Sequence, residues 1–175
     1  MAIPFDSSLE YPRKTDSRSV IRFQDCDPLR HLNNGKYFDY FFNAREDQIG
    51  RHFHVKPSDI FEQFGTAWVV MQHRIAYLRP ALMGEWVRIH SHLIWYNENT
   101  IVVEYYMAND EDTELKTVLW TTLRYVDVRG GQSRNHDFWV PDYLAAMVNE
   151  IGYESTNFES RLKQIKTELQ QNQSL

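Results

Sequence analysis

The residues best suited to chemistry gather in one stretch of the sequence. Two carboxylates, Asp25 and Asp27, are followed within a few residues by the imidazole of His31 and by the amides of Asn33 and Asn34. Carboxylates and imidazoles transfer protons, and a carboxylate can also attack an acyl carbon. Asparagine is a good helix N-cap, because its side-chain oxygen accepts an N–H group that the first turn leaves unpaired. The pattern predicts a carboxylate site at the N-terminus of a helix.

The helix that follows is strongly aromatic. Its first two turns carry Tyr37, Phe38, Tyr40, Phe41 and Phe42. A helix that is apolar nearly all round is expected to be buried. We expect it to run from residue 35 or 36 to residue 49, with Gly50 ending it in a left-handed conformation.

Each of these polar residues also has a structural interpretation. Asp27 precedes Pro28 and can simply begin a turn, and Asp25 is expected to bond to the backbone of the loop. Asn33 and Asn34 are expected to act as caps first and as ligand contacts second. A nucleophilic pair of Cys26 with His31 is not expected, because the two flanking carboxylates disfavour a thiolate.

Metal binding is not predicted. His90 and His92 share one face of an expected strand, and His52 lies close to His54, but no third ligand follows at convincing spacing. We therefore expect no metal and no cofactor.

The remaining elements must position this site. After a short helix that begins near Pro57 and ends at Gly65, the hydrophobic period changes from that of a helix to that of strands. Strands are expected at residues 19–23, 66–78, 86–96, 100–107 and 115–128. The connections are mostly of hairpin length, so the pattern predicts an antiparallel sheet wrapped around one buried helix.

Two helices are expected at the end of the chain. The first begins at Pro141 and its apolar stripe ends at Gly152. The second is amphipathic, and Thr156 with Glu159 is expected to form its capping box. We expect this last helix to cover a sheet edge or a partner subunit.

Length and composition limit the class of protein. A chain of 175 residues with 42% hydrophobic residues is expected to form one domain at residues 19–152, with an N-terminal arm at 1–18 and a C-terminal helix and tail at 153–175. A net charge of −5 with no basic cluster argues against nucleic-acid binding. A single cysteine, no signal-like segment and no long apolar run predict a cytoplasmic protein without a membrane span.

Several short motifs together resemble a known family. They are the Asp-Cys-Asp-Pro turn at 25–28, the His-Leu-Asn-Asn-Gly-Lys-Tyr segment at 31–37, Arg-Pro at 79–80 and Gly-Glu at 84–85. With the order of strands, they resemble the hot-dog fold, and within it the acyl-CoA thioesterases related to 4-hydroxybenzoyl-CoA thioesterase. The resemblance implies an α+β fold in which a five-stranded antiparallel sheet wraps around a long central helix, here with extra C-terminal helices.

The same resemblance implies a function. Asp27 stands where the family has its catalytic carboxylate, which acts as nucleophile or general base on a thioester, and a backbone N–H near Asn34 is expected to hold the thioester carbonyl. His31, Asn33, Asn34 and Tyr37 are the expected substrate contacts. The substrate would be an acyl-CoA or acyl-carrier-protein thioester, and the assembly a homodimer or homotetramer with its active site at the dimer interface. The candidates for binding the phosphates of coenzyme A are Arg79, Arg129 and Arg134, which can equally be ordinary surface residues.

The sequence departs from the family at one place. Leu29 and Arg30 stand where many such thioesterases have small residues, often a glycine. This change keeps open a second hypothesis, a hot-dog protein that binds an acyl or aromatic ligand, or assembles with partners, without hydrolysis. A hydratase or dehydratase is a third hypothesis, against which the position of Asp27 before the helix argues.

Overall fold

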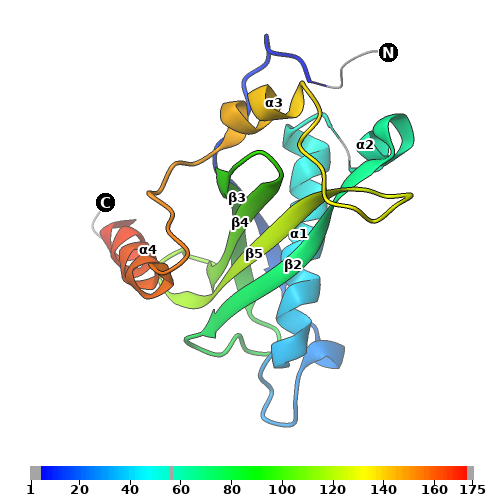
Figure 1. Cartoon of the computed structure of the whole chain (residues 1–175). Coiled ribbons are helices and arrows are strands. Elements are labelled where there is room, and N and C mark those ends of the chain that lie inside the picture. Colours follow the sequence, from blue (N-terminus) through cyan, green and yellow to red (C-terminus); the bar gives the residue numbers. More distant parts are fainter. Residues whose placement is uncertain (1–4, 56, 173–175) are drawn as a thin grey trace.

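The protein is built on one antiparallel sheet. The computed structural model describes residues 5–55 and 57–172, and it shows a five-stranded sheet in the order β1-β3-β4-β5-β2 (Figure 1). The strands are β1 (Thr15–Val20), β2 (Thr66–Tyr77), β3 (Trp86–Tyr96), β4 (Thr100–Asn109) and β5 (Leu115–Asp127). All neighbouring strands pair in antiparallel fashion, with β1 and β2 at the two edges.

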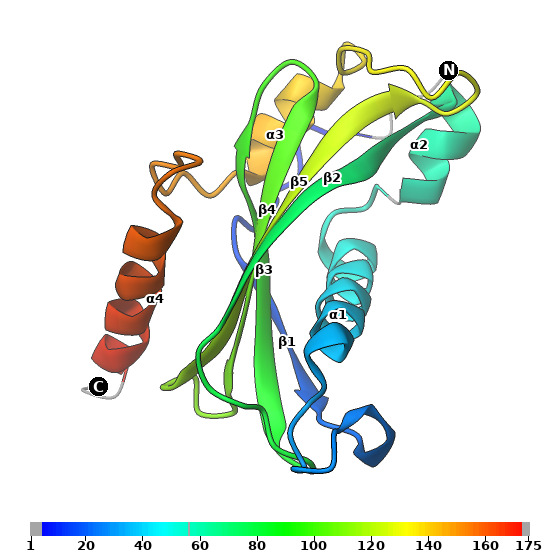
Figure 2. The same ribbon diagram turned by 60° about the horizontal axis from the view of Figure 1, so that its bottom comes forward.

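Helices lie on both faces of the sheet. The long helix α1 (Tyr37–His52) lies against one face and α4 (Phe158–Asn172) lies on the other side (Figure 2). The two shorter helices, α2 (Pro57–Phe64) and α3 (Val140–Met147), lie toward one end of the sheet. Short 3₁₀ turns, η1 (Phe23–Asp25) and η2 (Asn34–Lys36), precede α1. The predicted fold class, a sheet around a central helix with extra C-terminal helices, is confirmed.

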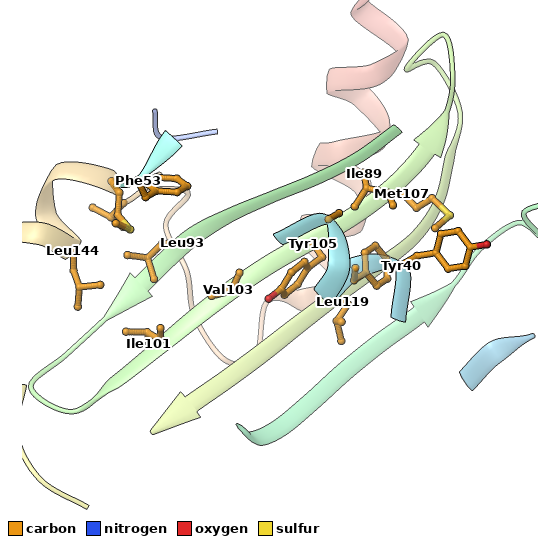
Figure 3. Close-up of a cluster of buried hydrophobic side chains, with 14 of the residues drawn as sticks. Tyr40, Phe53, Ile89, Leu93, Ile101, Val103, Tyr105, Met107, Leu119 and Leu144 are labelled. Carbon is orange, nitrogen blue, oxygen red and sulfur yellow. The ribbon is translucent and has the colours of Figure 1, made fainter. Parts of the chain in front are cut away.

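The main core fills the space between α1 and the sheet. Phe41 of α1 is fully buried, as are Met107 of β4 and Leu119 of β5. Figure 3 shows these sheet residues beside Tyr40 and Tyr105 in one apolar layer. Because burying a side chain of this size stabilises the fold by about 1.5 to 3 kcal/mol, the aromatic run in the sequence is what fixes α1 on the sheet.

The predicted end of the central helix is wrong. Gly50 lies inside α1, which continues to His52, and the residue with a left-handed φ of 56° is His54. Packing explains the extra turn, because Phe53 is 3% exposed and its N–H donates to the carbonyl of Ile49 at 3.1 Å. Burial of Phe53 therefore outweighs the preference for ending the helix at glycine.

The predicted strands match the structure better than the predicted ends of the chain. The third strand has the expected bounds, but the first lies at Thr15–Val20 and not at 19–23, so it begins within the segment expected to be an arm. Thr15 explains the error: it is polar yet 5% exposed, and its hydroxyl donates to the carbonyl of Ser91 at 2.8 Å. The predicted capping box is also wrong, because α4 begins at Phe158 and Thr156 lies two residues before it.

A second core lies between α4 and the outer face of the sheet. Its helical members recur at helical spacing and are all buried: Phe158, Leu162, Ile165 and Leu169. Beside them Arg161, 4% exposed, donates from Nη2 and Nε to the two carboxylate oxygens of Glu104 at 2.8 and 3.0 Å. The carboxylate of Glu104 also bonds to His92 at 2.9 Å and accepts from Trp120 at 2.8 Å. The amphipathic C-terminal helix is thus held on the sheet by apolar burial and by one buried ion pair.

Candidate active site

The side chain of Asp27 is fixed by its own loop. Its Oδ1 accepts the N–H groups of Leu29 at 2.9 Å and His31 at 3.0 Å. A main-chain hydrogen bond also closes the loop, because the Asp27 N–H donates to the His31 carbonyl at 2.8 Å. Within residues 5–55 and 57–172, Oδ2 of Asp27 makes no hydrogen bond. The turn role and the catalytic role proposed for Asp27 are therefore compatible, since each uses a different oxygen.

The tip of this loop has an unusual backbone. Arg30 has a φ of 65°, in the left-handed region that glycine adopts without a steric cost. For another residue this conformation costs roughly 1 to 2 kcal/mol. The loop therefore keeps the shape that a glycine would allow, even though Leu29 and Arg30 occupy it, and both side chains are exposed.

The start of the helix presents backbone donors. Asn33 is the N-cap of η2, and its Oδ1 accepts the N–H of Gly35 at 3.0 Å, as its expected capping role requires. Asn34 is exposed, and its N–H donates to no atom of the described chain. Its carbonyl accepts the hydroxyl of Tyr77 at 2.9 Å, so the end of β2 holds the start of the helix in place. The loop and the helix start are also tied directly, since the Asn33 N–H donates to the carbonyl of Asp25 at 3.0 Å.

The hydroxyls of two tyrosines of α1 make hydrogen bonds in and beside the loop. Tyr37 is 2% exposed, and its hydroxyl accepts the N–H of Ala81 at 3.1 Å, so only its main chain can face a substrate. The hydroxyl of Tyr40 accepts the N–H of Arg22 at 2.9 Å and donates to Asp25 at 2.9 Å, so Asp25 has a structural contact, with a side chain of α1 and not with the loop backbone as expected. Burial, and then the carboxylate of Asp25, raise the pKa of Tyr40 to about 12 against the lowering effect of the Arg22 N–H, so the hydroxyl remains a donor.

Tyr37 was expected as a substrate contact, whereas the structural role of the Tyr40 hydroxyl was missed because the sequence pattern indicated only an apolar helix. The signal that could have revealed this role is the alternation of tyrosine with phenylalanine on one helix. Phe38, Phe41 and Phe42 serve packing alone, whereas a tyrosine at a buried position needs a partner for its hydroxyl.

Cys26 is not suited to act as a nucleophile. Its Sγ lies 3.3 Å from the carbonyl oxygen of Arg22. Burial raises the pKa of the Cys26 thiol, and the neighbouring carboxylates of Asp25 and Asp27 raise it further. The thiol form is therefore favoured, in agreement with the argument from sequence.

Open hollows adjoin the loop. One, of about 380 Å³, is lined by Asp25, Cys26, Asn33 and the first residues of the helix, and another, of about 550 Å³, extends from Asp25 and Tyr40 along α1 and β1. Asp27 lines neither of them. The loop thus lies beside surface hollows and not at the bottom of a closed pocket in a single chain.

The three arginines considered for phosphate binding do not meet in one chain. Arg79 follows the end of β2 and pairs with Glu114 at 3.3 Å. Arg129 and Arg134 follow β5, whose last residues pair with the first residues of β2, and Arg134 bonds to Asp137 at 2.8 Å. They therefore lie at opposite ends of β2.

The histidines of β3 have other partners. His90 contacts Asp112 at 2.8 Å and His92 contacts Glu104 at 2.9 Å. Across the described ranges no cluster of three or more histidine, cysteine or acidic side chains could hold a metal ion.

Over the same ranges no helix has the length and hydropathy needed to cross a membrane, and the cytoplasmic location stays a prediction.

Comparison with known families identifies the class of protein. Residues 21–171 match the thioesterase-like superfamily, so the chain belongs to this family. The predicted resemblance to hot-dog thioesterases, and the predicted class of thioester hydrolase, are confirmed at the level of the family. No curated protein sequence matches the chain significantly.

Solved structures share the fold at low sequence identity. A probable thioesterase from Escherichia coli is 19% identical, with a TM-score of 0.67 over 77% of this chain and 98% of that chain. A DHNA-CoA thioesterase from Staphylococcus aureus is 20% identical, with a TM-score of 0.67 over 89% of this chain and 94% of that one. The 12:0-ACP thioesterase from Umbellularia californica is 12% identical, with a TM-score of 0.71 over 83% of this chain and 55% of that one.

Proposed function

We propose that the protein hydrolyses an acyl-CoA or aryl-CoA thioester to the free acid and coenzyme A, with Asp27 as the working carboxylate. The observation that carries this proposal is the state of its two oxygens. Oδ1 is held by the N–H groups of Leu29 and His31, whereas Oδ2 bonds to no described residue. A carboxylate that is fixed through one oxygen and open at the other is well arranged to act on a substrate.

The chemistry follows from these groups in two forms. As a nucleophile, Oδ2 of Asp27 attacks the thioester carbonyl, the thiolate of coenzyme A leaves, and water hydrolyses the resulting mixed anhydride. As a general base, the same oxygen takes a proton from the water that attacks. In both forms the carbonyl oxygen gains negative charge, and the unpaired N–H of Asn34 at the helix start can stabilise it with support from the helix dipole.

The exposed edge of the sheet supports a homodimer. β2 is an edge strand of 12 residues, and its centre exposes Val69, Val70 and Met71, which are 43%, 50% and 57% accessible. A long apolar edge strand is a ready template for pairing with another strand. We propose that two copies pair through β2 in antiparallel fashion, as a homodimer or as the unit of a homotetramer.

Such pairing would also complete the site. An antiparallel pair places the Tyr77 end of one β2 beside the Thr66 end of the other. Arg79 follows the first of these ends, and Arg129 and Arg134 lie near the second. The three candidates for phosphate binding, which are separated in one chain, would then approach each other across the interface.

The proposal is tested by measuring thiol release from a panel of short, long and aromatic acyl-CoA and acyl-carrier-protein thioesters. Wild type and Asp27→Asn are compared at equal concentration, after circular dichroism has shown equal folding. Asparagine is the appropriate change, because its Oδ1 can still accept the N–H groups of Leu29 and His31 while the carboxylate is lost. Turnover by wild type that collapses in the variant supports the proposal. Release from none of the thioesters would favour the non-hydrolytic binding protein instead.

A further inference from the structure

An apolar cavity of about 220 Å³ lies between the C-terminal half of α1 and the sheet. Its walls come from α1, α2, α3 and all strands except β1, and they include Leu93, Val103 and Leu144. Figure 3 shows these side chains, with Ile101 and Tyr105, along the sheet near Phe53. An open groove of about 510 Å³ shares Arg45, Ile49 and Tyr105 with the cavity, and it is also lined by Gly50 of α1 and Ser58 of α2.

A guanidinium without a counter-ion lies at this cavity. Arg45 lines both spaces, and its closest polar contact is the hydroxyl of Ser91 at 3.4 Å from Nη1. Its Cζ lies 5.0 Å from the ring centre of Phe53. Among the residues that the structure describes, no carboxylate lies within 4.0 Å of Arg45, and burial lowers its pKa. Arg45 is partly buried, and an unpaired charge is costly where water is partly excluded, so the position favours a ligand of opposite charge.

Arg161, which is 4% exposed whereas Arg45 is partly buried, shows the contrast. Arg161 is paired with Glu104 through Nη2 at 2.8 Å and with Glu168 through Nη1 at 2.8 Å. The guanidinium of Arg161 is thus paired with carboxylates of the chain itself, whereas the guanidinium of Arg45 at the cavity is not paired with any carboxylate of the described residues.

Two tyrosine hydroxyls at the cavity are also unpaired. Tyr105 and Tyr143 are 5% and 6% exposed, and neither hydroxyl has a hydrogen-bond partner in the described part of the chain. Both lie close enough to Arg45 to affect its pKa. Figure 3 shows the hydroxyl of Tyr105 pointing along the sheet toward Val103, another residue of the cavity wall. By contrast, the buried hydroxyls of Tyr37 and Tyr125 are bonded, to the Ala81 N–H and to Thr66 and Asp137.

We propose that this cavity binds a small carboxylic acid whose apolar body fills the pocket and whose carboxylate is bound by Arg45, with Tyr105 and Tyr143 as further donors. Arginine suits this task, because its planar fork of N–H groups matches a carboxylate with two parallel hydrogen bonds. The volume agrees with one substituted ring or a chain of similar size, since an apolar cavity of about 150 Å³ accommodates benzene.

The site lies away from the Asp27 loop within one chain. The loop precedes the first turn of α1 (Figure 1), whereas Arg45 and Ile49, the residues of α1 that line the cavity, lie in the second half of the helix. Arg45 comes eight residues after Tyr37, the first residue of α1, so it lies about 12 Å along the helix axis. The proposed binding site is therefore separate from the Asp27 loop, and binding there can be tested independently of hydrolysis at Asp27.

Isothermal titration calorimetry on the full chain at neutral pH tests the proposal with a matched pair of probes. 4-Methylbenzoate carries the proposed carboxylate, and 4-methylbenzamide is its neutral counterpart of nearly equal shape. We expect wild type to bind the acid at least about 10-fold more tightly than the amide, the factor expected of hydrogen bonds to a charged group. Arg45→Gln should reduce this ratio to about one by weakening the acid alone, and Tyr105→Phe should weaken the acid by about 3- to 10-fold.

Two control variants define the result. Arg51→Gln removes an exposed arginine from the same helix, and Asp27→Asn removes the proposed catalytic carboxylate; both should leave the ratio of the two probes unchanged. Equal affinity for acid and amide in wild type, or no binding of the acid, would overturn the proposal. So would a preference for the acid that survives in a folded Arg45→Gln protein. If that variant does not fold, Tyr105→Phe, which keeps the ring, decides the question in the same titration.

Discussion

The buried ion pair that joins α4 to the sheet gives the sharpest stability prediction. Arg161→Met keeps the aliphatic length of the side chain and removes the guanidinium. The carboxylate of Glu104, which is fully buried, would lose two donors at 2.8 and 3.0 Å and keep only its bonds with His92 and Trp120. The change therefore leaves a buried charge without its main counter-ion.

Removing one partner of a buried ion pair typically costs about 3 to 5 kcal/mol, because the remaining charge is left without compensation. The pKa of Glu104 indicates the same order. Burial alone raises it, but the hydrogen bonds from His92 and Arg161 outweigh burial and lower the pKa from 4.5 to about 2. A shift of this size corresponds to roughly 3 kcal/mol in favour of the folded state when the carboxylate is charged.

Urea unfolding at neutral pH, followed by circular dichroism, measures the effect. We expect Arg161→Met to lower the free energy of unfolding by about 3 to 5 kcal/mol. The control is Lys14→Met, because Lys14 pairs with Glu168 at 3.9 Å at the solvent-exposed rim of the same network and should contribute less than about 1 kcal/mol. A loss below about 1 kcal/mol for Arg161→Met would refute the view that this pair holds α4 on the sheet.

Three further predictions follow from packing, titration and the exposed edge. Ile165→Ala should lower the free energy of unfolding by about 2 to 5 kcal/mol, whereas Lys166→Ala, one position along α4, should change it by less than about 0.5 kcal/mol. Equal free energies of unfolding for the two variants in urea titrations would contradict the view that the second core stabilises the fold. Because the pKa of Glu104 is lowered from 4.5 to about 2, its contribution to stability is complete above pH 4.5 and is lost as the pH falls toward 2. The free energy of unfolding of Glu104→Gln should therefore decline less steeply than that of wild type between pH 4.5 and 2. Equal slopes for variant and wild type would contradict this prediction. Val70→Glu should shift the sedimentation of the protein toward the monomer while Leu9→Glu does not, and a dimer that persists in Val70→Glu would exclude the β2 interface.

The sequence predicted most of the sheet because alternation is a local signal. In β3, Val87, Ile89 and Leu93 are buried in the main core, and the expected bounds of this strand were correct. The first strand was misplaced because its buried face carries Thr15, whose hydroxyl satisfies a carbonyl of β3, and a polar residue of this kind gives no hydrophobic signal. The end of α1 was misplaced because Gly50 was weighed without the distant packing of Phe53.

The candidate site was predicted only in part for a similar reason. Asp27, His31, Asn33 and Asn34 are close in the sequence, and the structure brings them into one loop. Whether they act on a substrate stays a prediction. The grouping of Arg45, Tyr105 and Tyr143 could not be seen in the sequence, because these residues come from α1, β4 and α3 and meet only when the helices close over the sheet.

The most direct test of the proposed mechanism compares the two neighbouring carboxylates of the loop. Thiol release from the best acyl-CoA substrate is measured as kcat/KM for wild type, Asp27→Asn and Asp25→Asn, each shown to be folded. Both substitutions keep an oxygen that accepts the same hydrogen bonds, so they differ in which carboxylate they remove. We predict a loss of about 10² to 10⁴ in Asp27→Asn and less than about 10-fold in Asp25→Asn. Full activity in Asp27→Asn, or an equal loss in both variants, would contradict the assignment of Asp27 as the working carboxylate.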